Sequence, residues 1–243
     1  MTGVSFRPCI VIPTYDNPLT IAQVVHGAAH YVRDVIVVDD GSAEPGRGVI
    51  NGLAASGAAR VHRCERNLGK GAAVVTGFAL ARELGCTHAF QIDGDAQHDL
   101  GCIPKFLAAS AAAPTALVAG YPVFDESVPN LRKSGRQIAR FWVDVETGGA
   151  IITDPMTGFR VYPLDAAIAC GPYGSGMEFD IEIAVRLVWA GVPVVNLPVG
   201  VRYLSREDGG VSHFRMVRDN VRITWLHTRL TTAALWRKVW GRA

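Results

Sequence analysis

Three acidic segments in this chain each follow an apolar run of the kind that forms a buried strand. They are Pro13-Thr14-Tyr15-Asp16, Asp39-Asp40-Gly41-Ser42 and Asp93-Gly94-Asp95-Ala96-Gln97-His98. An Asp-Gly pair alone is an ordinary turn, and an Asp at a helix N-cap is equally common. Carboxylates that converge on one edge of a sheet, however, repel one another unless a cation or a polar ligand lies between them. Asp95 and Gln97 offer the hard oxygen ligands that Mg²⁺ or Mn²⁺ accepts, so we predict a divalent metal site there.

Two glycine-rich segments do not match the common phosphate-binding loops. Lys70 is followed by Gly71 rather than Ser or Thr, and no glycine stands five positions before Gly69, so the P-loop pattern is absent. Gly46-Arg47-Gly48 lacks the third glycine of a dinucleotide fingerprint and lies in a predicted turn. A Gly-Lys-Gly turn that opens a helix can still place backbone amides and the Lys70 ammonium near a diphosphate; a plain helix start is the other interpretation.

The elements that must position these residues alternate along the first hundred residues. Apolar runs predict strands at 10–12, 35–38, 59–62 and 89–92, and helical spacing predicts helices at 21–32 and 73–84. This alternation predicts a mostly parallel sheet with helices on both faces, in which ligands bind beyond the carboxyl ends of the strands. Further on we predict a loop at 122–130, helices at about 132–145 and 178–189, and strands near 159–162 and 192–201.

No linker or internal repeat separates the two halves of the chain. We therefore predict one α/β domain over residues 1–212, in which 1–120 bind the nucleotide and 121–212 supply the acceptor side of a cleft. Residues 213–243 are predicted to form a basic amphipathic helix.

Composition limits the class and the compartment. The chain has 243 residues, of which 49% are hydrophobic and 19% charged, with a net charge of +2; this is globular composition and excludes a disordered chain. The five cysteines are scattered and never spaced as Cys-x-x-Cys, so we expect a reducing, cytoplasmic compartment. Neither a signal peptide nor an apolar run of about 20 residues is visible, so we expect a soluble or peripheral protein.

Charge is uneven along the chain. Residues 1–200 hold 15 Lys and Arg against 19 Asp and Glu, whereas residues 201–243 hold 9 against 3. The basic tail also carries Trp225, Trp236 and Trp240, which suits a helix in peripheral contact with the inner face of the cytoplasmic membrane. An amphipathic helix packed on the domain is the alternative. The two can be combined: the stripe near Val217 is expected to pack inward, while residues 236–240 reach lipid. No nucleic-acid-binding motif accompanies the charge, so no nucleic-acid partner is expected.

Five motifs, in order, resemble family 2 glycosyltransferases and, within them, the dolichyl-phosphate or polyprenyl-phosphate mannose synthase group. The resemblance runs from about residue 8 to about residue 225. It implies a GT-A fold, an inverting transfer of a hexose from a UDP- or GDP-linked sugar, and a divalent metal. The motifs are Pro-Thr-Tyr-Asp at 13–16, Val-Val-Asp-Asp-Gly-Ser at 37–42, Asn-Leu-Gly-Lys-Gly at 67–71, Asp-Gly-Asp-Ala-Gln-His at 93–98 and Asp-Pro-Met-Thr-Gly-Phe-Arg at 154–160.

The resemblance also implies roles for single residues. Asp93, with the neighbouring Gly94, would contact the nucleotide sugar, and Asp95 and Gln97 would bind the metal. Basic residues of the second half would hold the acceptor phosphate and the donor diphosphate, although such a run on a helix is also an ordinary solvated face. The residues matched to the nucleotide are Pro13, Tyr15, Asp16 (where many members have Glu) and Asp40; those matched to the phosphates are Arg132, Arg136 and Arg202.

Two departures from that group bear on the acceptor. Tyr121 stands where the group has an arginine, and Ser212-His213 stands where it often has Ser-Lys. His213 is either a phosphate donor or a neighbour of the N-cap of the last helix. An acceptor phosphate is already anionic at neutral pH and needs positioning rather than a base.

A saccharide or small-molecule hydroxyl is therefore an alternative acceptor to a lipid phosphate, and it needs a base within hydrogen-bond reach. Asp180, between Glu178 and Glu182, is our candidate, and Asp154 is the second; all of these acids can equally serve as helix-end or turn residues. A non-catalytic nucleotide-sugar-binding module is a third possibility.

Overall fold

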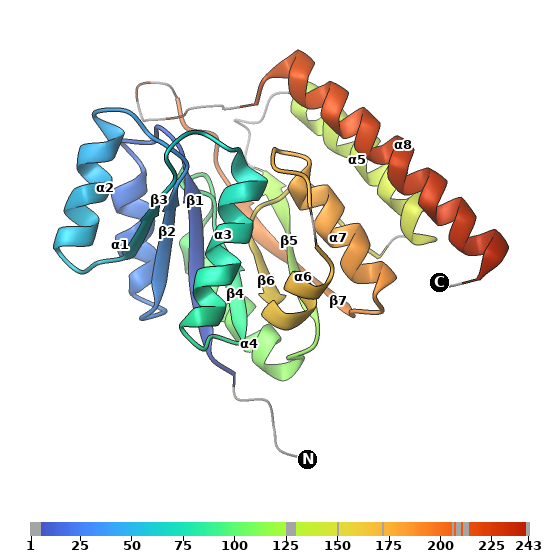
Figure 1. The fold of residues 1–243 in the computed structure, drawn as a ribbon, viewed down its shortest axis with the longest axis horizontal. Coiled ribbons are helices and arrows are strands. Elements are labelled where there is room, and N and C mark those ends of the chain that lie inside the picture. The colour runs from blue at the N-terminus through green and yellow to red at the C-terminus, as the bar shows by residue number, and fades with distance from the viewer. Residues whose placement is uncertain are drawn as a thin grey trace.

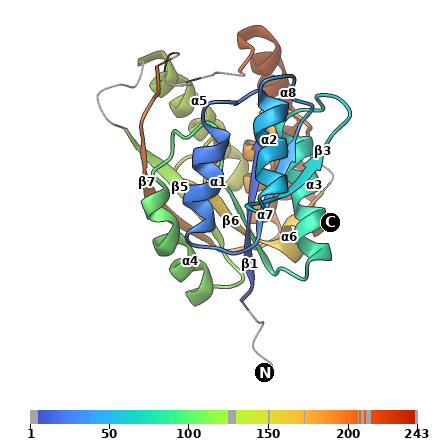
Figure 2. The same cartoon turned by 90° about the vertical axis from the view of Figure 1, so that its left-hand side faces the viewer.

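A computed structural model describes residues 6–124, 130–149, 151–171, 173–205, 207, 210 and 214–241. Seven strands form one sheet in the order β3-β2-β1-β4-β6-β5-β7, with helices on both faces (Figures 1 and 2). The strands are β1 Pro8–Thr14, β2 Val35–Asp39, β3 Arg60–Arg63, β4 His88–Gln91, β5 Leu117–Phe124, β6 Arg160–Pro163 and β7 Val194–Val201. The helices are α1 Ile21–Ala29, α2 Gly46–Ala55, α3 Lys70–Glu83, a short 3₁₀ turn Leu100–Cys102, α4 Ile103–Ala112, α5 Asn130–Thr147, α6 Leu164–Ala169, α7 Phe179–Trp189 and α8 Met216–Trp240.

Parallel pairing confirms the predicted sheet and explains the apolar runs of its central strands. β1 pairs in parallel with β2 and with β4, and its residues 9–12 are fully buried because helices cover both faces. Ile10 and Ile12 pack against α1 and α4, while Cys9 and Val11 pack against α3. The acidic segments after β1, β2 and β4 consequently lie at one edge of the sheet.

β6 runs antiparallel between β4 and β5. This reversal brings the start of β6 to the edge at which β4 ends, so residues 154–159 lie beside Asp93. The approach is so close that a Cβ at Gly158 would lie 2.7 Å from the Asp93 carboxyl carbon. The fold therefore places the second half of the chain against the acidic segment that follows β4.

Two local predictions are wrong. Residues 122–124 are not a loop, because β5 stays in register with β7 as far as the pair Phe124–Val201. Gly46, Arg47 and Gly48 are not a turn but the first turn of α2, which buries Ile50 and Leu53 against the sheet. In both places the tertiary partner outweighs the local Pro and Gly signals.

The last helix lies side by side with α5 along one flank of the molecule (Figure 1). His227 Nδ1 of α8 lies 2.8 Å from the buried Glu146 Oε1 of α5, and Leu226 and Leu230 bury the inner face of α8. Among the described residues, no helix is apolar and long enough to cross a bilayer.

The prediction that the stripe near Val217 packs inward is wrong. Val217 is 79% exposed, and Val221 and Trp225 also face solvent. The basic side of α8 faces the domain instead, because Arg229 pairs with Glu182 at 2.9 Å and Arg237 lies over the Trp189 ring at 5.2 Å. Because α8 has apolar residues on two sides, its orientation depends on these contacts together with the packing of Leu226 and Leu230.

Candidate active site

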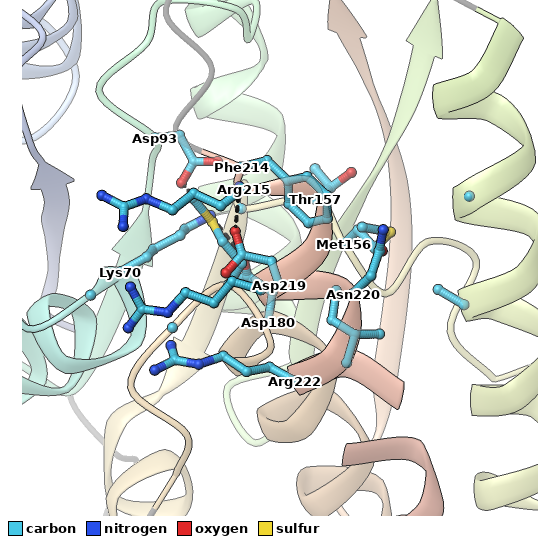
Figure 3. Close-up of a pocket in the computed structure, with 18 of the residues that line it drawn as sticks. Lys70, Asp93, Met156, Thr157, Asp180, Phe214, Arg215, Asp219, Asn220 and Arg222 are labelled. Carbon is cyan, nitrogen blue, oxygen red and sulfur yellow. Dashed lines mark hydrogen bonds and ion pairs between the residues drawn. The ribbon is translucent and has the colours of Figure 1, made fainter. Parts of the chain in front are cut away.

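A cavity of about 1300 Å³ opens at the edge of the sheet where the acidic segments converge (Figure 3). Residues after β1 and β4, among them Tyr15, Asp93 and Asp95, line one part of it. Helices α5 and α8 line another part with apolar side chains that include Ile138, Trp142 and Ile223. The predicted residues Pro13, Asp40, Lys70, Gly94, Gln97, Arg136 and Asp180 also line it.

Asp40 orders the loop that precedes α3. Its Oδ1 accepts a hydrogen bond from Leu68 N at 2.8 Å, and its Oδ2 accepts one from Gly69 N at 2.7 Å. Burial raises the pKa of Asp40, although these two hydrogen bonds oppose the rise. Gly69 adopts a φ of +106°, a conformation that favours glycine. Asp40 therefore lines the cavity and also fixes the loop that delivers Lys70.

Lys70 joins the two halves of the chain through ion pairs. Its Nζ lies 2.7 Å from Asp180 Oδ2 and 2.8 Å from Asp93 Oδ1. Burial disfavours the ammonium, but the charges of Asp180 and Asp93 outweigh it and raise the pKa of Lys70. The ammonium is thus charged, largely shielded from solvent and shared between two carboxylates.

Asp180 accepts hydrogen bonds on both carboxylate oxygens. Gln91 Nε2 donates to its Oδ1 at 2.9 Å, opposite the bond from Lys70 to its Oδ2. Burial opposes the ionisation of Asp180, yet the charges of Lys70 and Arg160 and these hydrogen bonds hold its pKa below the usual range. A carboxylate in this state is suited to orienting Lys70, and is a weak proton acceptor.

The first amides of α3 do not face the cavity as free donors. Gly71 N donates to Gly176 O at 3.2 Å, and Ala72 N donates to Ser175 O at 3.1 Å. A Cβ at Gly71 would lie 2.7 Å from Phe179 Cβ, so the helix start and residues 174–179 are in close contact. The expectation that these amides bind a diphosphate is therefore wrong, because the chain itself satisfies them.

Asp93 and Asp95 form the acidic part of the cavity, where the sequence predicts a metal. Burial, followed by the charge of Asp93, raises the pKa of Asp95. A divalent cation held by Asp95 and Gln97 would remove this repulsion, so the side chains present fit the group. The described residues contain no cluster of three or more His, Cys, Asp or Glu side chains placed to hold a metal. Magnesium often takes only one or two protein carboxylates beside substrate phosphates.

Arg136, one of the residues predicted to bind phosphate, lines the cavity. Its Nη1 donates to both oxygens of Asp154, at 2.8 and 2.7 Å, and to Thr157 Oγ1 at 3.1 Å. Burial disfavours its charge, but Asp154 outweighs burial and raises the pKa of Arg136. Asp154, the second candidate base, is therefore held in an ion pair with Arg136.

The acids beside Asp180 hold neighbouring segments together. Glu182 accepts from Gly174 N at 2.7 Å and pairs with Arg186 and Arg229, while Glu178 accepts from Gly176 N at 3.1 Å. These contacts connect α7 with α8 and with residues 174–176. Neither acid lines the cavity.

Several predicted residues lie elsewhere. Asp16 does not line the cavity; its Oδ1 accepts from Ala43 N at 2.8 Å and its amide donates to Ser42 Oγ, so it links the segments after β1 and β2. Arg202 has an exposed side chain outside the cavity, although its backbone N donates to Gln97 O at 2.9 Å. The side chain of Arg132 and the whole of His213 lie outside the described residues.

The sequence did not single out His98 and the arginines of α8 as cavity residues. The His98 ring contacts the Phe159 ring in a tilted arrangement, with ring centroids 5.2 Å apart, and burial lowers the pKa of His98. Arg215, Arg218 and Arg222 also line the cavity, whereas the sequence associates them with the membrane. Their spacing of three and four residues was the available signal, since it places them on one side of a helix.

The seven-stranded, mostly parallel sheet with an acidic cavity at its carboxyl edge has the GT-A architecture of nucleotide-sugar-dependent glycosyltransferases. The model of the family "Glycosyl transferase family 2" matches residues 9–168. The chain belongs to this family.

Two relatives show what kind of family member the chain is similar to. It is 28% identical over 232 residues to a polyprenol monophosphomannose synthase of Mycolicibacterium smegmatis, with 89% of this chain and 83% of the relative covered. It is 26% identical over 214 residues to an undecaprenyl-phosphate mannosyltransferase of Micrococcus luteus, with 84% and 86% covered.

Solved structures support the fold. Glucosyl-3-phosphoglycerate synthase of Mycobacterium tuberculosis, crystallised with Mn²⁺, uridine diphosphate and phosphoglyceric acid, has a TM-score of 0.70 to this chain. The alignment covers 95% of this chain and 78% of the other, at 15% sequence identity. At this identity the likeness establishes the fold alone.

Proposed function

We propose that the protein transfers a hexose, with inversion, from a nucleotide-diphosphate sugar to a lipid-linked phosphate, with Mg²⁺ or Mn²⁺ at Asp95 and Gln97. The observation that carries the choice of acceptor is the state of the candidate bases. Asp180 is bound by Lys70 and Gln91, and Asp154 is bound by Arg136. A phosphate acceptor needs no base, whereas a hydroxyl does.

The residues of the cavity suit such a transfer. Tyr15 and Asp40 would contact the nucleotide, and Asp93 would contact the sugar next to Lys70. The metal, when bound, neutralises charge that develops on the diphosphate leaving group. Arg136, oriented by Asp154, would approach the acceptor phosphate. Relatives named for polyprenol-phosphate and undecaprenyl-phosphate acceptors support this assignment.

The test is transfer by the purified protein. With Mn²⁺ or Mg²⁺, labelled UDP- and GDP-hexoses and a detergent-dispersed polyprenyl phosphate, we expect label in the organic phase, and none after chelation of the metal. An acceptor without its phosphate, the polyprenyl alcohol, is the matched control and should stay unlabelled. Absence of transfer and of donor hydrolysis across the whole panel contradicts the proposal.

A hydroxyl acceptor is the second candidate. One observation favours it: Asp154 already neutralises the charge of Arg136, which weakens the attraction of this arginine for a phosphate. In that case the label from the same donors would enter a water-soluble product when membrane-free extract is added, and the polyprenyl phosphate would stay unlabelled.

Membrane contact through the α5–α8 face belongs to the proposed function. We define this face by its exposed apolar residues, which lie in two groups on α8, at 217–225 and 235–240, and in a third group on α5. The exposed Lys238 and Arg140 lie on the same helices, which favours an anionic lipid surface over a neutral one. The residues are Val217, Val221, Trp225, Leu235, Trp236, Val239 and Trp240 on α8, with Ile138, Phe141, Trp142 and Val145 on α5.

Binding to vesicles measures this contact. We expect the protein to sediment with vesicles that contain phosphatidylglycerol, and expect the double variant Trp236→Ser/Trp240→Ser to bind at least tenfold more weakly, because each indole contributes buried apolar area. Tyr31→Ser removes an exposed aromatic ring after α1 and should bind as the wild type does. A wild-type protein that stays in the supernatant at every lipid concentration contradicts the contact.

A further inference from the structure

Three arginines of α8 form a row on the wall of the cavity. Arg215, at the N-cap, and Arg218 and Arg222, in the first two turns, all line the cavity. Figure 3 shows the side chains of Arg215 and Arg222 extending from α8 towards the side on which Lys70 lies. The arginine row, as we name these three residues, is distinct from the outward stripe of Val217, Val221 and Trp225 on the same helix.

The other cations of the cavity already have carboxylate partners. Lys70 is shared between Asp93 and Asp180, and Arg136 is bound by Asp154. Within the described part of the chain, the arginine row has one carboxylate within ion-pair distance, Glu178 Oε2, which lies 4.0 Å from Arg222 Nη1. Asp219, on the same helix, accepts a hydrogen bond from the backbone N of Arg215 and has no ion pair printed with the row's guanidinium groups. Among the described residues, the row is therefore the cationic group of the cavity with the fewest ion pairs for its number of charges.

The two ends of the arginine row lie near residues that we assign to the donor side of the cavity. At one end, Arg215 lines the same cavity as Tyr15, which follows β1. At the other end, Arg222 lies against residues 176–178, which contact the first turn of α3 at Lys70. Asp93 and Lys70 line the same cavity (Figure 3).

We propose that the arginine row binds the diphosphate of the nucleotide-sugar donor, a use of α8 that rests on the proposed function. Metal and arginines would then hold the diphosphate from two sides: Asp95 and Gln97 through the cation, and α8 through guanidinium groups that donate paired hydrogen bonds to phosphate oxygens. The C-terminal helix contributes to donor binding in addition to its contact with α5.

The test is a titration of the full-length protein with UDP and with GDP in the presence of Mn²⁺. For the nucleotide that the wild type binds better, Arg218→Ala and Arg222→Ala should each raise Kd about ten- to hundredfold, the loss expected for one charged hydrogen-bonding partner. Arg218→Lys should lose less affinity for the nucleotide than Arg218→Ala. Lys105→Ala, on the exposed side of α4 outside the cavity, is the matched control and should leave Kd unchanged.

A readout of charge separates direct binding from a structural role. The affinity of the wild type should fall as salt rises, and Arg218→Ala should show a shallower salt dependence, because one screened interaction is gone. The corresponding nucleoside, which has no phosphate, should bind each variant as it binds the wild type.

Three results would overturn the proposal. In the first, the arginine variants bind the diphosphate as tightly as the wild type. In the second, diphosphate affinity is unchanged and the half-saturating concentration of polyprenyl phosphate rises, which would assign the row to the acceptor. In the third, the wild type binds neither UDP nor GDP, and the proposed function fails together with this inference.

Discussion

Replacing Asp95 with alanine should abolish metal-dependent transfer, with a loss in turnover of at least about a thousandfold. The carboxylate is one of two predicted protein ligands, and charge stabilisation on the leaving diphosphate commonly accounts for several kcal/mol of the barrier. The measurement is transfer from the labelled donor in Mn²⁺. Full metal-dependent turnover of a folded Asp95→Ala would show that the metal assignment is wrong.

A second readout of Asp95→Ala does not depend on turnover. Without metal, the variant should be at least as stable as the wild type, because it removes a partly buried carboxylate that is repelled by Asp93. At a hundredfold excess over Kd, Mn²⁺ should stabilise the wild type by about 2.7 kcal/mol, which raises Tm by roughly 5–10 °C at this chain length.

Asp95→Ala should not show this rise in Tm. Glu83→Ala, which removes an exposed acid at the far end of α3, is the matched control and should respond to Mn²⁺ as the wild type does.

Replacing Lys70 with methionine should lower the free energy of unfolding by about 3–5 kcal/mol at pH 7. Methionine has a similar length but no charge, so Asp93 and Asp180 would be left without their shared counter-ion, and loss of one partner from a buried ion pair is strongly destabilising. Denaturant unfolding measures the effect. Arg82→Met, in the exposed last turn of the same helix, should change stability little.

The double variant Lys70→Met/Asp180→Asn tests the cause of that loss. It removes one of the two unpaired carboxylates, so it should recover part of the stability that Lys70→Met loses. If Lys70→Met unfolds at the wild-type midpoint, the ammonium does not stabilise this buried cluster.

The effect of Lys70→Met should also depend on pH with a definite sign. Burial opposes the ionisation of Asp180, but in the wild type Lys70 and Arg160 hold the pKa of Asp180 below its usual value. Its stabilising contribution is therefore complete above about pH 4 and is lost as the pH falls through the depressed pKa. In Lys70→Met, burial should dominate and raise the pKa of Asp180, so protonation of Asp180 should stabilise the variant. The stability difference should be largest at pH 7 and should shrink as the pH falls towards 3.

The acidic side of the cavity was predictable because it depends on short-range features. Each acidic segment directly follows an apolar run, and parallel strands end at one edge of their sheet, so Asp40, Asp93 and Asp95 were expected to converge before any contact was known. The mostly parallel sheet follows from the same alternation of strands and helices.

The contacts between side chains were decided only by the tertiary structure. Lys70 and Asp180 are 110 residues apart, and the sequence around either residue does not predict that the two side chains pair. Their ion pair depends on the packing of α3 against α7. The same holds for Arg160, fully buried in a strand, where its side chain donates to the carbonyls of Asp154 and Asp180.

The sequence by itself determined that α8 is a helix with apolar and basic sides, but it did not determine how α8 is turned. Periodicity fixes which residues share a face; it does not fix which face meets the domain when apolar residues occur on more than one side. Packing of Leu226 and Leu230, the ion pair of Arg229 with Glu182 and the ring contact of Arg237 set that rotation. They leave Val217 in solvent and direct the arginine row into the cavity, because burial of one face constrains every other residue on a rigid helix.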